Sequence, residues 1–499
     1  MSSPLNEWRK LRWCAACAAW LAAGCAVGPN FKPPPAPPGA GYTATPLRAT
    51  AATAHVAGGE AQQFRMDADI PADWWRLFHS QPLDALIAAA LKSNPGMKAA
   101  QAALRVAYED MQAQRGAYFP ALSASMAAAR QKQSEQLAPT PNFPVVANEF
   151  QYDLFTPELT ISYAPDVFGL NRRTVESLRA QEESARFQMI ATWTTLSANV
   201  VVTAVQAASL REQVQATRKV IDLEKRSLAI LQLRFQRGDA SGLDMAAQQS
   251  QLAQVAATLP ALVKQLAQTD HALAALTGRF PNQAPLATLS LTDLHLPGDL
   301  PLSLPSTLVA QRPDVRQARA DLHAASAQVG IATAQRLPNI QLTADAGSSA
   351  LAISQLFGSG TGFWGVAASL TAPIFQGGQL LHQERAAKAA YVEAAQQYRG
   401  TVLAAFQNVA DTLVALQQDA QALQAAATAA HAASRTLYLS QLQLRRGYIG
   451  VFELLAAEQA YQQAQMTLAQ DEANRFADTA ALYQALGGGW WHYAEMNTP

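Results

Sequence analysis

Apolar and polar residues alternate one by one along four short stretches of the chain, two in each half. They cover residues 122–127, 159–163, 340–346 and 364–370. A period of two predicts β-strands with one apolar face. Such strands are either half buried in a small soluble sheet, or face lipid on one side and a lumen on the other. The stretches alone leave both interpretations open.

Two other stretches lack helix breakers over an unusual length. Leu170–Arg237 contains neither Gly nor Pro, and Gln379–Arg446 contains no Pro and a single Gly, Gly400. An unbroken helix over either stretch would be roughly 100 Å long, whereas helices of globular proteins average about a dozen residues. The pattern therefore predicts coiled-coil-like helices in an elongated assembly. Shorter helices, each interrupted at a proline, are expected over 83–114 and 306–336.

The two halves of the chain resemble each other. Asn94-Pro95 matches Arg312-Pro313, 218 residues later, and Arg237-Gly238 matches Arg446-Gly447, 209 residues later. A period near 210 is too long for a solenoid repeat and indicates duplication of half a subunit. The shorter second offset assigns about ten extra residues to the first copy, between Pro120 and Pro165, where a loop is expected.

The first 24 residues have the features of a secretory signal. Three basic residues precede the apolar run Trp13–Ala23, which is too short to cross a bilayer core of ~30 Å. Leu21-Ala22-Ala23-Gly24-Cys25 resembles a bacterial lipobox, in which the Cys receives a diacylglyceryl chain, although the Leu stands one place early. The alternative is a plain signal peptide cleaved after a small residue. In the lipoprotein pattern, Ala26 favours the outer membrane.

Composition excludes several classes of function. The net charge is zero, with 37 basic and 37 acidic residues, so nothing attracts nucleic acid electrostatically. Cys14 and Cys17 lie in the signal, which leaves no disulfide and no cysteine-based metal site in the mature chain. The eight His are scattered without metal-ligand spacing, and no Ser/His/Asp set has catalytic spacing. We therefore expect neither a metal nor an enzyme.

The predicted strands have consequences for assembly if they enter a membrane. One chain would leave two open sheet edges in lipid, and each unpaired backbone group costs several kcal/mol there. Closure needs about eight strands or more. A dimer would supply eight strands, packed solid, and a trimer would supply twelve, with room for a lumen.

Several motifs together are similar to the bacterial outer-membrane efflux protein family, the TolC-like channels, and within it to the lipoprotein branch often called NodT-type. They are Cys25–Pro33, Trp74–Phe78, Ala372–Gly378, Leu486–Trp490 and the paired Arg-Gly turns. The resemblance implies a mainly α fold with a small membrane β-barrel portion. Four strands per chain would contribute to a twelve-stranded trimeric β-barrel, and long helical hairpins would form a periplasmic α-barrel.

The same resemblance implies the outer-membrane channel of a tripartite, RND-type efflux pump. It would be a homotrimer that works with a periplasmic membrane-fusion adaptor and an inner-membrane transporter. It would passively release small toxic or amphipathic compounds, and its only non-protein groups would be the acyl chains on Cys25. Two alternatives remain: the duct of a type I protein secretion system, and a lipid-anchored coiled-coil scaffold without a pore. The strands argue against the scaffold.

This organisation divides the chain into six parts. They are a signal peptide (1–24), a lipidated Pro-rich tether (25–70), a first repeat (71–285), a linker (286–305), a second repeat (306–489) and a C-terminal tail (490–499). Trp74 is expected to start the ordered part.

The two Arg-Gly turns are the candidate functional sites. Gly238 and Gly447 are well placed as left-handed helix caps, and Asp244 and Glu453 suit the start of the next helix. Capping alone would explain these residues; the resemblance adds adaptor docking. The docking candidates are Arg237, Gly238, Asp239, Gly242, Asp244, Arg446, Gly447, Gly450 and Glu453.

The resemblance also implies a closed periplasmic aperture at the same turns. Its candidate residues are Asp239, Asp244, Arg445, Tyr448, Ile449, Phe452 and Glu453. The best-known members hold this gate with an Arg–Asp pair, but Ile449 and Ala456 occupy the matching places here. Apolar contacts of Tyr448, Ile449 and Phe452 are expected to hold it instead.

Overall fold

A computed structural model describes residues 26–35, 41–43, 47–66, 68–132, 151–283, 285–303 and 305–493. The predicted signal peptide, the predicted lipid acceptor Cys25 and most of the predicted C-terminal tail lie outside the described residues. So do residues 133–150, which lie in the segment between Pro120 and Pro165 where the extra loop is expected.

The chain forms two compact units, and each takes segments from both halves of the sequence. We call them the sheet unit, within 1–33, 105–183 and 320–396, and the hairpin unit, within 34–104, 184–319 and 397–499. The long helices run from one unit into the other. The boundaries predicted for the two repeats stay a prediction.

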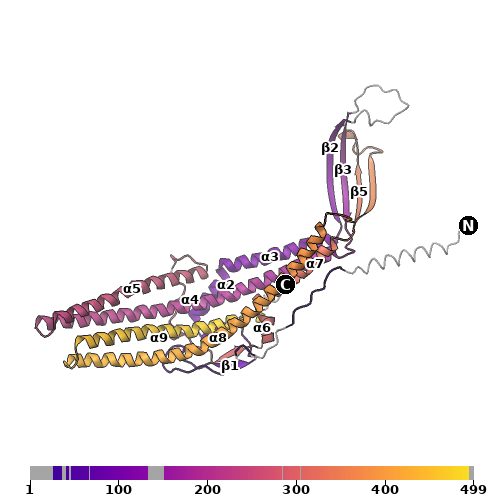
Figure 1. The fold of residues 1–499 in the computed structure, drawn as a ribbon. Helices are drawn as coiled ribbons and strands as arrows, with labels where there is room; N and C mark the ends of the chain where they lie inside the picture. Colours follow the sequence, from indigo (N-terminus) through magenta and orange to yellow (C-terminus); the bar gives the residue numbers. More distant parts are fainter. Residues whose placement is uncertain are drawn as a thin grey trace, which may run out of the picture. The chain divides into compact units, whose positions relative to one another are not determined.

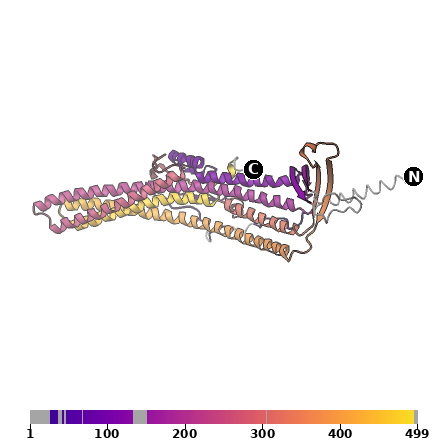
Figure 2. The same cartoon turned by 90° about the horizontal axis from the view of Figure 1, so that it is seen from above.

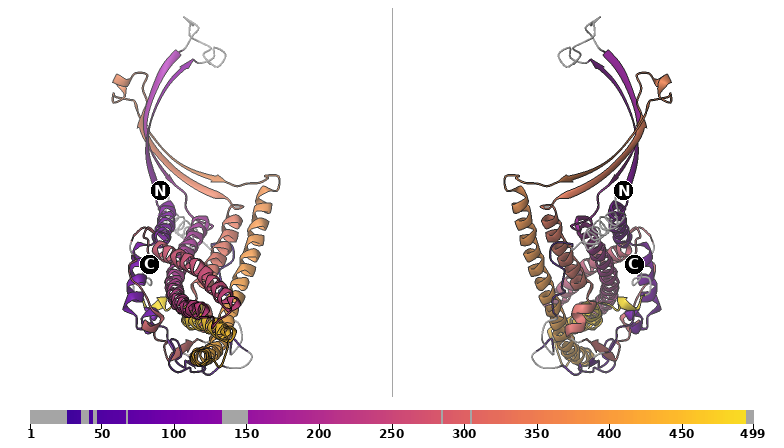
Figure 3. Two further views of the ribbon diagram at one scale, coloured as in Figure 1. Left: turned by 90° about the vertical axis from the view of Figure 1, so that its left-hand side faces the viewer. Right: turned by 90° about the vertical axis from the view of Figure 1, so that its right-hand side faces the viewer.

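The sheet unit contains four antiparallel strands in the order β2-β3-β5-β6 (Figure 1). Their bounds are β2 (Ala121–Lys132), β3 (Gln151–Tyr163), β5 (Asn339–Ser348) and β6 (Gly362–Thr371). All four strands predicted from the period of two are confirmed. Figure 3 shows that the strands curve strongly along their length. β2 and β6 are the edges of this sheet, so within the described residues each has one side without a neighbouring strand.

The register gives the sheet one apolar and one polar face, because directly paired residues of antiparallel strands share a face. One row across the four strands is Leu122, Ile161, Ala344 and Val366. The adjacent row, on the other face, is Ser123, Thr160, Asp345 and Gly365. The apolar face is uncovered in the single chain: Trp364 is 80% exposed and Val366 is 77% exposed.

Four helices form two long antiparallel hairpins, seen from a second direction in Figure 2. The first pairs α4 (Leu170–Gln236) with α5 (Gly242–Leu276), and the second pairs α8 (Gln379–Arg445) with α9 (Val451–Ala485). The long helices have 67 residues each and their partners 35 each. The two predicted long helices are thus confirmed, and their equal lengths agree with a duplication. None of the helices in the described ranges has the length and apolarity needed to span a membrane.

The shorter helices break where the prolines predict. α2 (Gln81–Ser93) is followed by α3 (Pro95–Arg115), and α6 (Pro305–Gln311) by α7 (Pro313–Ala334). At the first break the side-chain oxygen of Asn94 accepts hydrogen bonds from the backbone of Gly96 and Met97, which caps α3. Single turns of 3-10 helix are η1 (Trp74–Phe78), η2 (Gly116–Tyr118), η4 (Leu291–Asp293), η5 (Ile353–Gln355) and η6 (Trp490–His492).

Aromatic residues from two distant motifs build the core of the hairpin unit. Trp74 stacks on Tyr483 with 5.2 Å between ring centroids, and Phe78 meets Phe476 edge to face. The indole of Trp490 donates a 2.7 Å hydrogen bond to the carbonyl of Gln311. The Trp-Trp motif near residue 74 therefore packs against the last turns of α9, and Trp490 of the C-terminal motif binds the end of α6.

Order begins before Trp74, so that expectation was wrong. β1 (Gln63–Met66) pairs in parallel with β4 (Asp299–Leu302). The fully buried Arg475 donates hydrogen bonds to the carbonyls of Gly58 and Glu60. A buried guanidinium needs acceptors, and this segment supplies them from its backbone. Its partners lie more than two hundred residues away, where the local pattern gives no sign of them.

Candidate functional site at the hairpin tips

The first hairpin turn closes in a Schellman motif. Gly238 has φ +82°, its N–H donates to the carbonyl of Phe235 at 3.0 Å, and the N–H of Asp239 donates to Arg234 at 2.8 Å. These two bonds satisfy carbonyls left free at the end of α4. The predicted left-handed cap at Gly238 is confirmed.

The second turn repeats this geometry. Gly447 has φ +75° and donates to Leu444 at 3.1 Å, and Tyr448 donates to Gln443 at 3.0 Å. The cap predicted at Gly447 is confirmed as well. A side chain at either glycine would meet open space, so backbone conformation and not crowding selects glycine there.

The helices that follow the turns start differently. The Ser241 hydroxyl accepts from the N–H of Asp244 at 3.1 Å, and the Asp244 carboxylate accepts from the N–H of Ser241 at 3.0 Å. This is a complete capping box for α5. Gly450 stands at the same place before α9 and has no side chain to offer. Both turns keep an acid in the first helical turn, as predicted: Asp244 and Glu453.

The turns are open to solvent in the single chain. Among the docking candidates Asp244 is half-buried; the exposed ones are Arg237, Gly238, Asp239, Gly242, Arg446, Gly447, Gly450 and Glu453. The aperture candidates include large apolar groups in the open: Tyr448 is 74% exposed and Phe452 is 52% exposed, beside half-buried Ile449. Exposed apolar groups clustered at one turn are typical of an interaction surface.

Just behind the turns, a cavity of about 560 Å³ lies between the two hairpins. Arg445, one of the aperture candidates, lines it together with Arg226 and Arg234 of α4. Its charged lining residues are all arginines, and the rest of its wall is mainly aliphatic, with a serine and two glutamines. The structure thus brings Arg445 to a basic, apolar cleft between the hairpins.

Comparison with known protein families identifies the family of this chain. The model of the family described as outer membrane efflux protein matches residues 86–279 and 304–488. The two matched segments follow the two halves of the chain. This chain is an outer membrane efflux protein.

Individual relatives of this efflux protein agree with the family match. It is 30% identical to the toluene efflux pump outer membrane protein TtgF of Pseudomonas putida, over 94% of each chain. It is also 30% identical to the pyoverdine export outer membrane protein OpmQ of Pseudomonas putida, over 84% of this chain and 88% of the relative.

Solved channels share its fold. The outer-membrane channel OprN superimposes with a TM-score of 0.80 at 25% identity, over 93% of this chain and all of OprN. The open state of the MtrE outer membrane channel of Neisseria gonorrhoeae gives 0.77 at 25% identity, over 93% of this chain and 98% of MtrE. The efflux protein therefore resides in the bacterial outer membrane and has the fold of a TolC-like channel. Its family is one of channels and not of enzymes.

Sequence reasoning missed a buried acidic cluster that joins the two hairpins of the efflux protein. Glu224 of α4 and Glu458 of α9 are 0% and 1% exposed. Gln248 of α5 donates to Glu224, and Ser227 donates to Glu458 at 3.3 Å. One carboxyl oxygen of each Glu meets no hydrogen-bond donor among the residues that the structure describes. A search for acids on the interior face of the helical period would have singled out both residues.

The environment of this pair keeps a proton on it. Burial, together with the neighbouring Glu224 carboxylate, raises the pKa of Glu458 to about 8. Burial also raises the pKa of Glu224. Two buried carboxyls side by side cannot both ionise without strong repulsion, so they share a proton at neutral pH. With this proton the two carboxyls carry one negative charge instead of two. The cluster can then connect α4, α5 and α9 through its hydrogen bonds.

Proposed function

We propose that this efflux protein is the exit duct of a tripartite, RND-type pump for small toxic or amphipathic compounds. A periplasmic adaptor would join its hairpin tips to an inner-membrane transporter, so that the cargo never re-enters the periplasm. Relatives named for efflux of toluene, solvents and antibiotics support this class of cargo. Because the family is one of channels, we propose passive conduction without catalytic residues.

The two faces of the sheet carry the proposal. An apolar face that is uncovered in one chain fits lipid, and a polar face carrying Glu158 and Asp345 fits an aqueous lumen. The edges β2 and β6 must be paired before such a sheet can lie in lipid. Three copies close a twelve-stranded barrel wide enough to leave a lumen, and the hairpins of the three copies would continue it as a periplasmic tube.

The test of the assembly is a mass measurement on the protein purified in detergent. We expect three chains per particle, with the strand content retained. A stable monomer that keeps its strands would contradict the proposal, because its edges would have to remain open.

The test of the function is complementation. A strain without this gene should accumulate toluene or a fluorescent amphipathic dye, and the wild-type gene should restore export. Restoration should require the adaptor and the transporter. Restored export in a strain that lacks the adaptor would contradict a tripartite pump.

We also propose that Cys25 carries the lipid predicted from the lipobox. Labelled palmitate should enter the wild-type protein and not the Cys25→Ser variant, and both proteins should reach the outer membrane because the sheet and not the acyl chain spans it. Equal labelling of the two proteins would refute acylation at this residue.

A further inference from the structure

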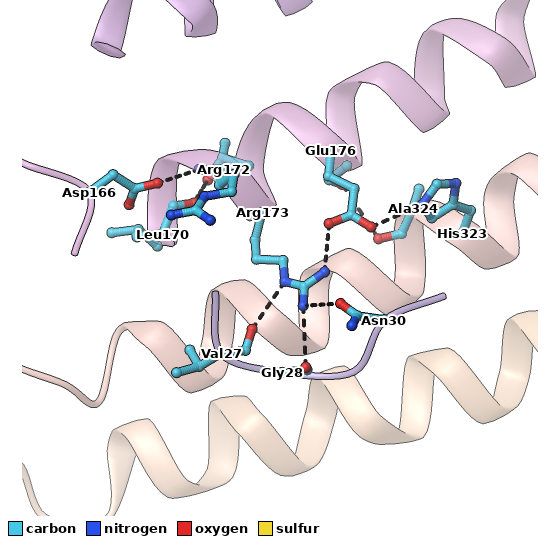
Figure 4. Close-up of polar contacts among 12 residues, drawn as sticks. Val27, Gly28, Asn30, Asp166, Leu170, Arg172, Arg173, Glu176, His323 and Ala324 are labelled. Atoms are coloured by element: carbon cyan, nitrogen blue, oxygen red, sulfur yellow. Dashed lines mark hydrogen bonds and ion pairs between the residues drawn. The ribbon is translucent and has the colours of Figure 1, made fainter. Parts of the chain in front are cut away.

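Arg173, in the first turn of α4, reaches three acceptors on one short segment of the N-terminal chain. Its side chain is only 4% exposed. Nε donates to the carbonyl of Val27 at 3.0 Å, and Nη2 donates to the carbonyl of Gly28 at 3.2 Å and to Oδ1 of Asn30 at 2.9 Å (Figure 4). A buried guanidinium that binds backbone carbonyls recognises the path of a chain, because such acceptors exist in every residue.

The remaining side of the guanidinium is held in place. Nη1 donates to Glu176 at 2.7 Å, and the other oxygen of Glu176 lies 3.0 Å from Nε2 of His323 (Figure 4). Burial opposes the charge on Glu176, but the hydrogen bonds from Arg173 and His323 outweigh it and keep the pKa of Glu176 below its usual value. The ring of Phe31 stacks on His323, with 4.4 Å between centroids and 12° between planes.

Glycines let the segment approach the protein closely. Gly28 has φ +92°, and a side chain there would run into the backbone of Gly330 on α7. A Cβ on Gly330 would lie 2.9 Å from two carbons of Arg173. The N–H of Val27 donates to the carbonyl of Phe168 at 3.2 Å, and a Cβ on Gly169 would lie 2.7 Å from Ala26. The segment is thus enclosed by α4, α7 and the connection before α4.

We propose that Arg173, Glu176, His323 and Gly330 form a receptor for residues 26–31, and that this receptor fixes the point at which the lipid anchor joins the channel. The inference rests on the proposed acylation of Cys25. Nothing but one peptide unit, ~3.8 Å between Cα atoms, separates that residue from Ala26. Arg173 is a positioning residue for the anchor.

The receptor lies at the end of the sheet, where the chain passes from β3 into α4. β3 ends at Tyr163 and α4 begins at Leu170, and Ala26 and Val27 contact the connection between them. The acyl chains would therefore start where the strands end and the helices begin, at one rim of the proposed barrel. The Pro-rich stretch that starts at Pro33 comes after the docked residues 26–31 in the sequence. It therefore does not lie between the lipid and the receptor and cannot serve as a flexible linker between them.

Proteolysis of the full-length lipidated protein in open outer-membrane fragments, whose periplasmic side chymotrypsin can reach, tests the receptor. Chymotrypsin cleaves after aromatic residues that can leave their packing, so Phe31 reports on the docked segment. We expect cleavage after Phe31 to be slow in the wild type and about 10-fold faster in Arg173→Met and in Asn30→Ala, since such cleavage follows the population of the open state. The cut removes residues 25–31, and mass spectrometry identifies the new N-terminus at Lys32.

Matched variants separate docking from misfolding. Arg172→Met removes the exposed neighbour of Arg173 on the same helix and should behave as wild type. Gly330→Ala should speed cleavage by displacing the Arg173 side chain, whereas Gly116→Ala, which meets no atom within 4 Å, should not. Asn30→Ala changes only the docked segment, so its effect cannot arise from a damaged helix. Arg173→Lys should be intermediate, because an ammonium has only three donors and no planar fork with which to reach the four acceptors of Arg173.

Palmitate label makes the outcomes distinguishable. In the wild type the label should stay with the intact chain, and in Arg173→Met chymotrypsin should release it in a short peptide while the channel stays in the membrane. Equal cleavage after Phe31 in the wild type, Arg173→Met and Asn30→Ala would overturn the receptor. A third outcome is that no palmitate label enters the protein while the variants keep the expected order of cleavage rates. This outcome would refute lipidation and the positioning of the lipid, but the docking of residues 26–31 would remain supported.

Discussion

The two hairpin turns have the same backbone and different surfaces. Both close with a left-handed glycine and the same pair of hydrogen bonds, at Gly238 and Gly447. The first turn is then stabilised from within by the Ser241–Asp244 capping box. The second lacks such a cap and instead exposes Tyr448 and Phe452. Duplication has kept the geometry, and the chemistry has diverged.

This difference assigns distinct roles to the turns. A capped turn needs no partner to be stable, because its free backbone groups are already satisfied. A turn with exposed aromatic groups gains free energy when a partner covers them. We therefore expect the second turn to supply most of the binding energy for the adaptor, and the first to supply a fixed shape beside it.

The buried pair Glu224–Glu458 prevents the two hairpins from behaving independently. It lies 14 residues before Gly238 along α4, which is roughly 20 Å of helix. It connects α4 and α5 of the first hairpin to α9 of the second. Any motion that separates the turns from each other has to strain or open this cluster.

The largest expected effect is a pH-dependent change in stability that arises from the pair Glu224–Glu458. The folded protein keeps a proton on Glu458 up to about pH 8, whereas an unfolded chain would lose it near pH 4.5. The folded state therefore binds more protons between these values, and the free energy of unfolding falls as pH rises through this window. Glu458→Gln should remove this pH-dependent loss of stability, which is of order 5 kcal/mol over the whole window, since one pKa unit corresponds to ~1.4 kcal/mol.

Melting temperatures from pH 5 to pH 9 would measure this effect. Glu472 and Asp478, whose pKa values burial raises to about 7, act in the same direction, so the difference between wild type and variant is the informative quantity. Glu453→Gln, on the exposed turn, is the matched control and should follow the wild-type curve. Parallel curves for Glu458→Gln and wild type would show that the pair does not share a proton.

The next effect distinguishes the two turns directly. Replacing both Tyr448 and Phe452 with Ser should weaken adaptor binding by about 2 kcal/mol or more, because buried aromatic groups dominate interface energies. The melting temperature should barely change, since both side chains are exposed in the free chain. Leu243→Ser, which removes an exposed apolar group from the first turn, is the control and should weaken binding less. Equal losses from the two turns, measured by binding to purified adaptor, would remove the proposed division of roles.

A smaller effect should follow from the backbone of the turns. Gly447→Val places a β-branched residue at φ +75° and should cost about 1–2 kcal/mol locally. The trimer and its membrane insertion should survive, while adaptor binding and drug resistance fall, because the angle of the hairpin changes. Gly238→Val should do the same less strongly, and Gly242→Ala, whose φ is not in the left-handed region, should be silent. Normal export by Gly447→Val, or complete loss of trimer, would refute tip docking at this motif.

The sequence predicted what depends on neighbours along the chain. The period of two located the four strands, the absence of Gly and Pro located α4 and α8, and the Arg-Gly pairs located both caps. Long-range pairs escaped it. Arg173 meets a segment about 145 residues earlier, and Ser227 meets Glu458 231 residues later. The hydrophobic period predicts which face of a helix is buried but not which residues cover it. The receptor at Arg173 and the acidic pair could therefore be found only from the three-dimensional structure.

The smallest expected effect exchanges the caps of the two turns. Ser241→Ala should destabilise the start of α5 by about 1 kcal/mol, because the N–H of Asp244 loses its acceptor. Gly450→Ser should give α9 the hydroxyl that it lacks, and a gain of a few tenths of a kcal/mol is expected there, since glycine is itself a fair cap. Amide hydrogen exchange at residues 243–245 and 452–454 would measure both. The contradicting outcome is that Ser241→Ala leaves hydrogen exchange at 243–245 unchanged while Gly450→Ser slows exchange at 452–454. The stability of the first turn would then come from its surroundings and not from its own cap. The contrast between a turn that is stable alone and a turn that depends on a partner would no longer hold.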